Sequence, residues 1–161
     1  MTIAEYNSCV DSFADGVYRF ILKSLDDEEL ARDVVQESFT RLWERRKDVK
    51  SEKAKSYLFT TAYHTMIDTI RKEKRQTRLE DYHISEMIFE SSAIDLKAVL
   101  NEAVDKLPEI QKSVVMLRDY EGYSYKEIGQ ITGLNESQVK VYIYRARVFL
   151  KNYIGSLHNV I

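Results

Sequence analysis

Apolar residues recur at alternating steps of three and four along most of this chain, which is the spacing of one face of an α-helix. One such stripe runs from Tyr6 to Ile21 and a second from Leu30 to Trp43. Five glycines and one proline in 161 residues are too few to form the turns between many strands. The sequence therefore predicts an all-α fold.

The stripes fall into two groups, which predicts two small helical domains. Three stripes lie within residues 1–75, the third beginning near Ala54, and three helices can bury their apolar faces against one another. Residues 76–95 break the pattern and hold five acidic residues against one basic residue. Because apolar side chains lie among these acids, we interpret the segment as a linker that docks on another surface and not as a free tether. Residues 96–161 resume the helical spacing and form the second expected domain.

The second domain carries the pattern of a helix-turn-helix. Ser124 and Glu127 have the spacing of a capping box, and the short helix that they open ends at Gly133. Asn135 then caps a longer helix. In a helix-turn-helix the second helix enters the major groove of DNA, with its N-terminal residues facing the base edges.

Polar and aromatic residues occupy the face of this last helix that remains once its core positions are assigned. The candidate base-contacting residues are Glu136, Ser137, Gln138, Lys140, Val141 and Tyr144, and Arg145 and Arg147 further along suit phosphates. Residues 136–153 hold four basic residues and one acidic residue, so a local basic patch exists. An ordinary solvated face on a three-helix unit is the alternative that the pattern leaves open.

Charge is distributed unevenly, although the total is close to zero. The formal net charge of −2 argues against a protein that coats nucleic acid through its total charge. Residues 1–40, however, hold nine acidic and three basic residues, whereas residues 71–78 hold five basic residues and one acidic residue. The acidic segment suits a basic protein surface, and the basic segment suits a phosphate backbone.

Several classes of protein are disfavoured. The single Cys9 cannot close an intrachain disulfide, and no stretch approaches the roughly 20 apolar residues of a membrane span. Charged residues interrupt the apolar runs of residues 1–25, unlike a signal peptide, so we expect a cytoplasmic protein. His64, His83 and His158 lack the spacing of metal ligands, and no Gly-rich phosphate loop is present. We therefore expect no catalytic residue, no metal, no cofactor and no small-molecule substrate.

Three segments resemble a known family, the extracytoplasmic-function sigma factors of bacterial RNA polymerase. Region two of that family is similar to LARDVVQESFTRLWERR at 30–46 and to KSYLFTTAYHTMIDTIRKEKR at 55–75. Region four is similar to LPEIQKSVVMLRDYEGYSYKEIGQITGLNESQVKVYIYRARVFL at 107–150. The resemblance implies a factor that binds core polymerase, reads the −35 promoter element as duplex, and melts and captures the −10 element. It also implies that the acidic linker threads the basic cleft of the polymerase.

The resemblance assigns roles to residues of the first domain. The family's D-x-x-Q-E segment falls on Asp33, Gln36 and Glu37, and Thr40 follows three residues later. The resemblance implies that this face binds the largest polymerase subunit. The residues implied to contact the −10 element are Ser56, Tyr57, Tyr63, His64, Asp68, Arg71, Lys72, Lys74 and Arg75. The loop 51–56 corresponds to the family's pocket for a base flipped out of that element. Tyr57 stands where the family usually has Trp and His64 where it usually has Asn, while Tyr63 is equally suited to a half-buried core position.

In the second domain the resemblance places Lys140, Val141, Tyr144 and Arg145 on positions that read the −35 element. Tyr142 replaces a residue that is often Arg, and an aromatic ring there also suits internal packing. The family is commonly silenced by an anti-sigma factor, which adds a third expected partner to core polymerase and promoter DNA.

Two further alternatives are left open by the residues themselves. One is a stand-alone transcription regulator whose first domain dimerises or senses a signal, for which paired DNA half-sites would be needed. The other is a helical adaptor that binds only protein.

Overall fold

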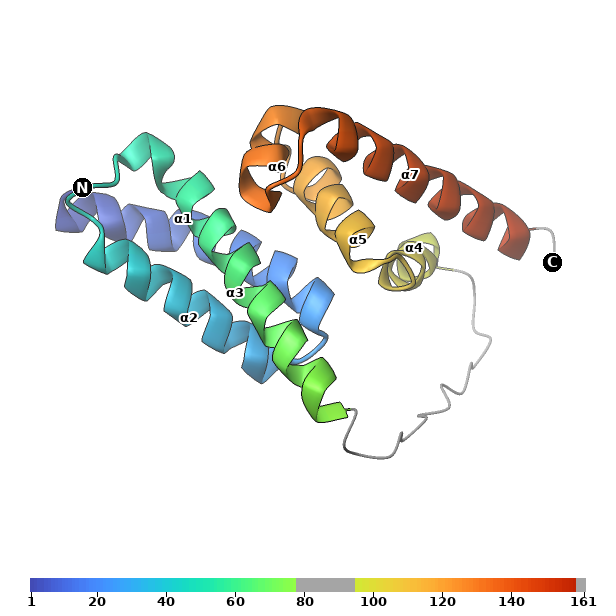
Figure 1. The fold of residues 1–161 in the computed structure, drawn as a ribbon, viewed down its shortest axis with the longest axis horizontal. Coiled ribbons are helices and arrows are strands. Elements are labelled where there is room, and N and C mark those ends of the chain that lie inside the picture. The colour runs from blue at the N-terminus through green and yellow to red at the C-terminus, as the bar shows by residue number, and fades with distance from the viewer. Residues whose placement is uncertain (78–94, 159–161) are drawn as a thin grey trace.

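The computed structural model describes residues 1–77 and 95–158 of the chain, and within these ranges all regular structure is helical. The first domain holds α1 Ile3–Leu25, α2 Glu28–Glu44, the short 3-10 helix η1 Ser51–Lys53 and α3 Ala54–Thr77. The second holds α4 Leu96–Asp105, α5 Glu109–Val115, the π-helix η2 Met116–Tyr120, α6 Tyr125–Thr132 and α7 Glu136–His158. The prediction of two all-helical domains is confirmed (Figure 1).

The first domain is a bundle in which α1, α2 and α3 pack against one another (Figure 1). Its apolar stripes meet inside, where Phe20, Leu42, Phe59 and Met66 are almost completely buried. The N-cap of α2 is Asp27, whose carboxylate accepts a hydrogen bond of 3.1 Å from the backbone N–H of Leu30. This bond satisfies one of the free donors at the helix start and fixes where α2 begins.

The helix-turn-helix of the second domain forms as the capping signals predict. Ser124 Oγ accepts from the backbone N–H of Glu127, and the Glu127 carboxylate accepts from the backbone N–H of Ser124, each at 3.1 Å. Gly133 ends α6 with φ of +81°, a conformation that costs glycine little. Gly129 allows the turn to approach α6, because a Cβ at this position would lie 2.7 Å from the backbone oxygen of Leu134.

The helix that follows Pro108 does not remain regular up to Tyr120. It begins at Glu109, directly after Pro108, and then widens into the π-helix η2. A π-helix contains one extra residue per turn, so it changes the direction in which the following side chains point. Arg118 stabilises the chain after it by donating to the carbonyl of Tyr123 at 2.9 Å.

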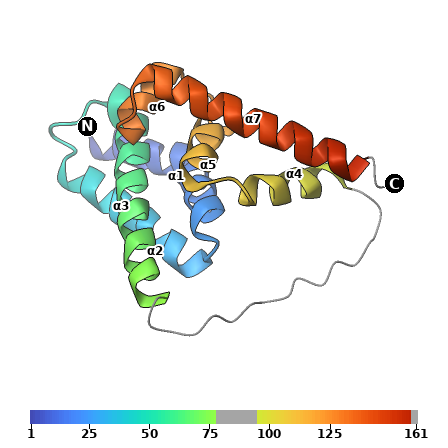
Figure 2. The same cartoon turned by 45° about the vertical axis from the view of Figure 1, so that its right-hand side comes forward.

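The two domains are in contact. Figures 1 and 2 both show α6 lying beside the first half of α3, and the buried residues of the two domains form one continuous hydrophobic cluster. The acidic linker and its expected docking lie outside the described residues, so its bounds at 76 and 95 stay a prediction. None of the described helices is long and apolar enough to cross a membrane.

Candidate protein and nucleic-acid interfaces

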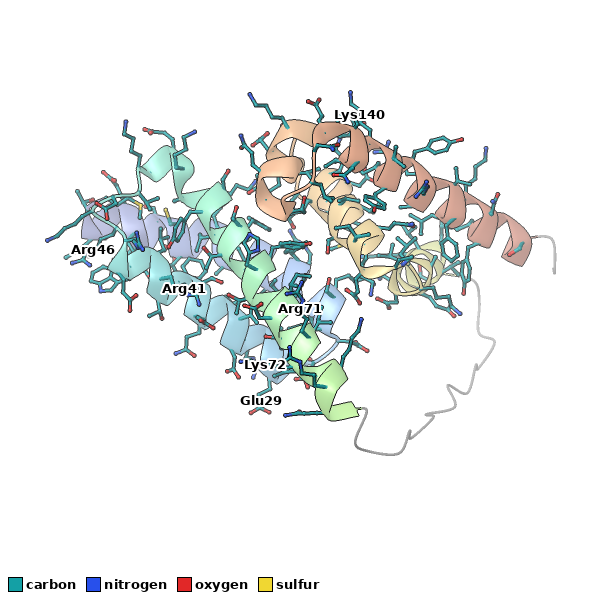
Figure 3. The ribbon with its side chains drawn as sticks, in the orientation of Figure 1. Glu29, Arg41, Arg46, Arg71, Lys72 and Lys140 are labelled. Atoms are coloured by element: carbon teal, nitrogen blue, oxygen red, sulfur yellow. The ribbon has the colours of Figure 1, made fainter. Side chains whose placement is uncertain are left out.

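An acidic stripe follows the outer face of α2. The four residues singled out from the sequence, Asp33, Gln36, Glu37 and Thr40, are all exposed and recur at steps of three and four. Two further exposed acids, Glu29 and Glu44, fall on the same face at helical spacing and were missed by the sequence reasoning (Figure 3 labels Glu29). The signal that would have found them is the same periodicity, continued one turn in each direction.

Burial of the opposite face of α2 directs this stripe towards solvent. Ala31, Val34 and Leu42 are buried against the other two helices. Ser38 is also buried, and its hydroxyl donates to the carbonyl of Val34 at 2.8 Å, so its polar group is satisfied within the helix. Packing therefore fixes the rotation of α2 and presents the acidic stripe to solvent.

One face of α3 collects most of the residues predicted to contact the −10 element. Tyr57, His64, Asp68, Arg71 and Arg75 follow one another at helical spacing. All are exposed except Tyr57, which is half-buried. Arg71 and Arg75 lie at the end of this face, beyond Asp68, so the surface is basic towards the C-terminus of α3.

Lys72 and Lys74 are exposed on either side of that face. Lys72 lines a shallow groove of about 290 Å³ between α2 and α3, together with Asp33 and Glu37 of the acidic stripe. Lys72 and Arg71, labelled in Figure 3, therefore belong to different surfaces, although they are neighbours in the sequence.

A polar hollow of about 340 Å³ lies where the end of α2 meets the start of α3. Its lining residues are Arg41, Glu44, Arg45, Tyr57 and Thr61. The loop 51–56 that the sequence pointed to adjoins this hollow in the chain but does not line it. Arg41 near the end of α2 and Arg45 directly after it were not predicted, because nothing in their spacing indicates that they face the beginning of another helix.

Tyr63 is placed differently from the other α3 residues. Only 7% of its surface is exposed. Burial raises the pKa of its hydroxyl, and among the charges that act on it are Arg71, which lowers the pKa, and Glu109 of α5, which raises it. Tyr63 lies one turn after Phe59, whose ring contacts that of Tyr123 in the second domain, so Tyr63 lies on the flank of α3 that meets this domain and its ring is not available to DNA in this arrangement. Ser56 is half-buried.

The outer face of α7 is open. Glu136, Ser137, Lys140, Val141, Tyr144 and Arg145 are all exposed, as predicted. Tyr144 is 70% exposed and Val141 44%, while Val139, Ile143 and Ala146 on the other side are buried. The exposed stripe is continued by Val148, so its centre is apolar and its borders are charged. Tyr142 is partly buried and packs against the core, which answers the question left by the sequence.

Two of the predicted α7 residues are engaged in structural bonds. Gln138 accepts a hydrogen bond from the backbone N–H of Asn135 at 3.0 Å, while the Asn135 side chain accepts from the backbone N–H of Gln138 at 2.8 Å. Arg147 donates to both carboxylate oxygens of Asp119 in η2, at 2.7 Å and 3.4 Å. This hydrogen bond raises the pKa of Arg147 and pairs its positive charge with the Asp119 carboxylate, so its surroundings favour a positioning role.

Neither metal binding nor a histidine site gains support in the parts of the chain that the structure describes. No group of three or more His, Cys, Asp or Glu side chains in residues 1–77 and 95–158 is arranged to hold a metal ion. His64 is an exposed residue of α3, and its ring is close to that of Tyr63, with centroids 5.5 Å apart. His83 lies outside the described residues.

Comparison with known proteins gives consistent matches over both domains. The family model described as sigma-70 region 2 matches residues 9–76, and the one described as sigma-70 region 4 matches residues 97–150. The ECF RNA polymerase sigma factor SigM of Bacillus subtilis is 31% identical over 144 residues, or 86% of this chain and 88% of that protein. RNA polymerase sigma factor SigV of the same organism is 31% identical over 141 residues, with coverages of 86% and 84%.

Solved structures share the fold. The sigma factor RpoE from Bartonella quintana, solved in complex with the anti-sigma factor NepR, superposes with a TM-score of 0.79 at 20% identity. That match covers 95% of this chain and 98% of the other. CnrH, solved in complex with the cytosolic domain of CnrY, gives a TM-score of 0.66 at 19% identity and covers 94% and 88%.

Proposed function

The chain belongs to the extracytoplasmic-function sigma factors, which act in transcription initiation and are not enzymes, and we propose that it directs core RNA polymerase to promoters by reading two DNA elements. One observation supports this above the others. The chain presents two separate helices, α3 and α7, each with its own exposed row of basic and aromatic residues. Two reading surfaces in one small chain suit a target made of two elements.

The acidic stripe of α2 is the proposed site for core polymerase. Asp33, Gln36, Glu37 and Thr40 point away from the bundle, and Glu29 and Glu44 lengthen the negative surface. A row of carboxylates complements a basic protein surface and speeds association with it. Glu37 is held in place by Arg41, whose guanidinium donates to it at 2.6 Å.

Core binding is tested by reversing charge in the stripe. The double variant Asp33→Lys/Glu37→Lys should weaken binding to core polymerase by on the order of 100-fold, because each close charge pair is worth about 1.5 kcal/mol or more. The matched control is Asp15→Lys, an exposed acid of α1 outside the stripe. Equal losses for the stripe and the control would remove α2 from the interface.

The exposed face of α3 is the proposed reader of the −10 element. Arg71 and Arg75 suit the phosphates of the melted strand, and Tyr57 borders a hollow whose size and polar lining suit an unstacked base. Extruding a base costs a few kcal/mol, and stacking on an aromatic ring returns about 1–3 kcal/mol per base. Arg41 and Arg45 add positive charge beside that hollow.

The outer face of α7 is the proposed reader of the −35 element in duplex form. Lys140 and Arg145 carry the positive charge, and Val141 and Tyr144 offer apolar contacts of the kind that thymine methyl groups accept. The N-terminus of α7 adds free backbone donors for a phosphate.

Neither reader is sufficient alone. A single helix-turn-helix buries only about 600–1,000 Å² on DNA, and each base contact contributes roughly 1–3 kcal/mol. When polymerase holds both domains on one promoter, the second contact becomes intramolecular and the affinities combine. Free chain should therefore bind DNA weakly.

The decisive experiment is run-off transcription from a promoter library by bacterial core polymerase, with and without this chain. We expect transcripts that start at defined sites only when the chain is present. An absence of chain-dependent transcripts, together with no binding to core, would contradict the proposal. A tight, sequence-specific gel shift by the free chain at physiological salt would contradict the two-element mechanism alone.

An anti-sigma factor is proposed as a further partner. The support is that RpoE of Bartonella quintana was solved with such a protein, and that α7 exposes the apolar residues Val141, Tyr144 and Val148. Contiguous exposed apolar residues are typical of surfaces that another protein covers.

A further inference from the structure

A small hollow of about 240 Å³ opens beside the first turns of α7. Its lining residues are Asn135, Ser137, Gln138, Val141, Tyr142 and Arg145. Asn135 precedes the helix, and Gln138, Tyr142 and Arg145 recur at steps of four and three, so these three share one side of it. In a helix-turn-helix, this end of the second helix faces the base edges in the major groove. The hollow therefore lies where the edge of one base can be recognised.

The capping bonds of α7 determine which atoms of two side-chain amides remain for a ligand. Gln138 Oε1 accepts from the backbone N–H of Asn135 at 3.0 Å, and Asn135 Oδ1 accepts from the backbone N–H of Gln138 at 2.8 Å. Each amide oxygen is thus directed at the backbone, and each amide nitrogen, Gln138 Nε2 and Asn135 Nδ2, keeps its two hydrogens for other partners. At the hollow, both amides therefore act as donors.

Arg145 adds a further donor to the hollow. Its guanidinium group is exposed and can only donate hydrogen bonds. Arg147 is bonded to Asp119 and Lys140 lies 3.8 Å from Glu136, whereas no acidic side chain among residues 1–77 and 95–158 pairs with Arg145. None of the residues that line the hollow is acidic. The amides and the guanidinium thus offer several donors, and no carboxylate is present to accept from a ligand.

The remaining wall of the hollow is apolar. Val141 is 44% exposed, so its methyl groups are accessible from solvent. Tyr142 is partly buried and packs against the core, which holds its ring in place beside the hollow. A ligand that matches both parts of this surface must carry an apolar group next to a hydrogen-bond acceptor.

Among the four bases, thymine presents this combination in the major groove. Its edge carries the C5 methyl group and, next to it, the O4 acceptor. Guanine offers acceptors without a methyl group. Cytosine and adenine each place an amino group in the groove, which would meet the donors of the hollow with another donor and leave both without a partner.

We propose that this hollow selects thymine at one position of the −35 element. The thymine methyl group contacts Val141, and thymine O4 accepts from Gln138 Nε2, with Arg145 as a second donor. The assignment rests on the function proposed above and names the base that this part of α7 recognises. Gln138 is then both a capping residue and a specificity-determining residue, because the cap fixes the direction in which its amide donates.

The base is tested by changing single atoms of the DNA. The starting point is a promoter identified by run-off transcription, whose −35 element is randomised and selected for binding to core polymerase with this chain. We expect thymine to be enriched at one position. Uracil there should weaken binding about fourfold, the effect of one methyl group. 5-Methylcytosine keeps the methyl group but replaces O4 with an amino group, and should weaken binding about 10-fold or more.

The roles of the two side chains are tested by variants on the same DNA. Gln138→Glu keeps the cap, because a carboxylate at this position also accepts from the backbone N–H of Asn135. It replaces the amide donor with an acceptor, so the preference should change from thymine to 5-methylcytosine, whose amino group donates to a carboxylate. Val141→Ser should remove the difference between thymine and uracil and keep that between thymine and 5-methylcytosine.

The matched control is Gln130→Glu, the same chemical change at an exposed position of α6 outside the hollow. It should leave the base preference unchanged, and urea unfolding of each variant shows whether its domain is folded. The modified bases are also compared with the unchanged chain, so the assignment stays testable if a variant does not fold.

Three results would overturn the assignment while leaving the proposed function in place. The first is a selected −35 element without a preferred thymine. The second is equal binding of thymine, uracil and 5-methylcytosine at the enriched position. The third is a folded Gln138→Glu variant with the base preference of the unchanged chain. An absence of any chain-dependent transcript would instead contradict the proposed function, and the assignment with it.

Discussion

The two helices proposed to read DNA, α3 and α7, differ in what surrounds them. α7 packs one side against its own domain and leaves the other side entirely to solvent. α3 packs one side against α1 and α2, and a second flank with Tyr63 is covered by the other domain. The face of α7 proposed to read duplex DNA is thus accessible in this arrangement, whereas the face of α3 proposed to read the single strand is only partly so.

The two surfaces also differ in chemistry. The end of the α3 face is basic, with Arg71 and Arg75, and suits phosphates of any sequence. The centre of the α7 face is apolar, with Val141, Tyr144 and Val148. α3 should therefore contribute mainly salt-dependent affinity, and α7 mainly discrimination between bases.

The largest expected effect comes from reversing charge on α3. Arg71→Glu/Arg75→Glu should lower run-off transcription by on the order of 100-fold, because two charged contacts of about 1.5–3 kcal/mol each are lost. The dependence of promoter binding on salt should become less steep as well. Lys97→Glu/Lys151→Glu changes charge equally at exposed positions outside α3 and is the control. If both variants lose the same activity, the effect is one of total charge.

Next in size is a change that damages only the second domain. Gly129→Ala places a Cβ 2.7 Å from the backbone oxygen of Leu134, and we expect a loss of about 2 kcal/mol in the free energy of unfolding. Gly155→Ala on α7 meets no atom within 4 Å and should instead stabilise the helix by about 0.5–1 kcal/mol. The free energies of unfolding of the two variants are measured by urea denaturation. Equal effects would show that the approach of the turn to α6 is unimportant.

A third change addresses the apolar centre of α7. Tyr144→Ala should weaken promoter binding by the holoenzyme about 10-fold, since one base contact is worth roughly 1–3 kcal/mol. On a promoter with a scrambled −35 element, variant and unchanged chain should bind alike. Phe149→Ala, an exposed aromatic further along the same helix, is the control. A loss that persists on the scrambled promoter would exclude a role in base recognition.

The smallest effect concerns the capping box of α6. Hydrogen bonds from Ser124 lower the pKa of Glu127 below its ordinary value of 4.5. Because the pKa is lower in the folded state, the stabilisation is present above pH 4.5 and is lost as the pH falls through the folded value. Thermal unfolding between pH 6 and 3 should show a smaller acid-induced decrease in Tm for Glu127→Gln than for the unchanged chain. Ser124→Ala should cost about 1 kcal/mol at neutral pH, and parallel Tm curves for Glu127→Gln and the unchanged chain would contradict the assignment.

Much of the fold was predictable because its signals are local. Ser124 and Glu127 mark a helix start through bonds to backbone only three residues away, and these bonds form as expected. The same holds for the exposed face of α2, because burial of one side of an amphipathic helix determines what the other side presents.

The surroundings of single side chains could not be predicted in the same way. Tyr63 is buried on the flank of α3 that meets the second domain, which follows much later in the chain, and no local pattern reports such a contact. Arg147 is bound by Asp119 of η2, and no local pattern indicates that this helix widens there. The family assignment was confirmed by comparison, whereas the individual contact residues stay predictions.

The widened turn η2 has a consequence for how tolerant this chain is of length changes. A one-residue deletion between Met116 and Tyr120 would be absorbed by tightening η2 to a regular α-turn, whereas winding all of its residues as a regular α-helix would rotate the side chains there and beyond by up to about 100°. Asp119 would swing away from Arg147 and Glu121 away from Arg19 in a single step. The extra residue in η2 thus determines whether Asp119 reaches Arg147 within the second domain and whether Glu121 reaches Arg19 of the first domain.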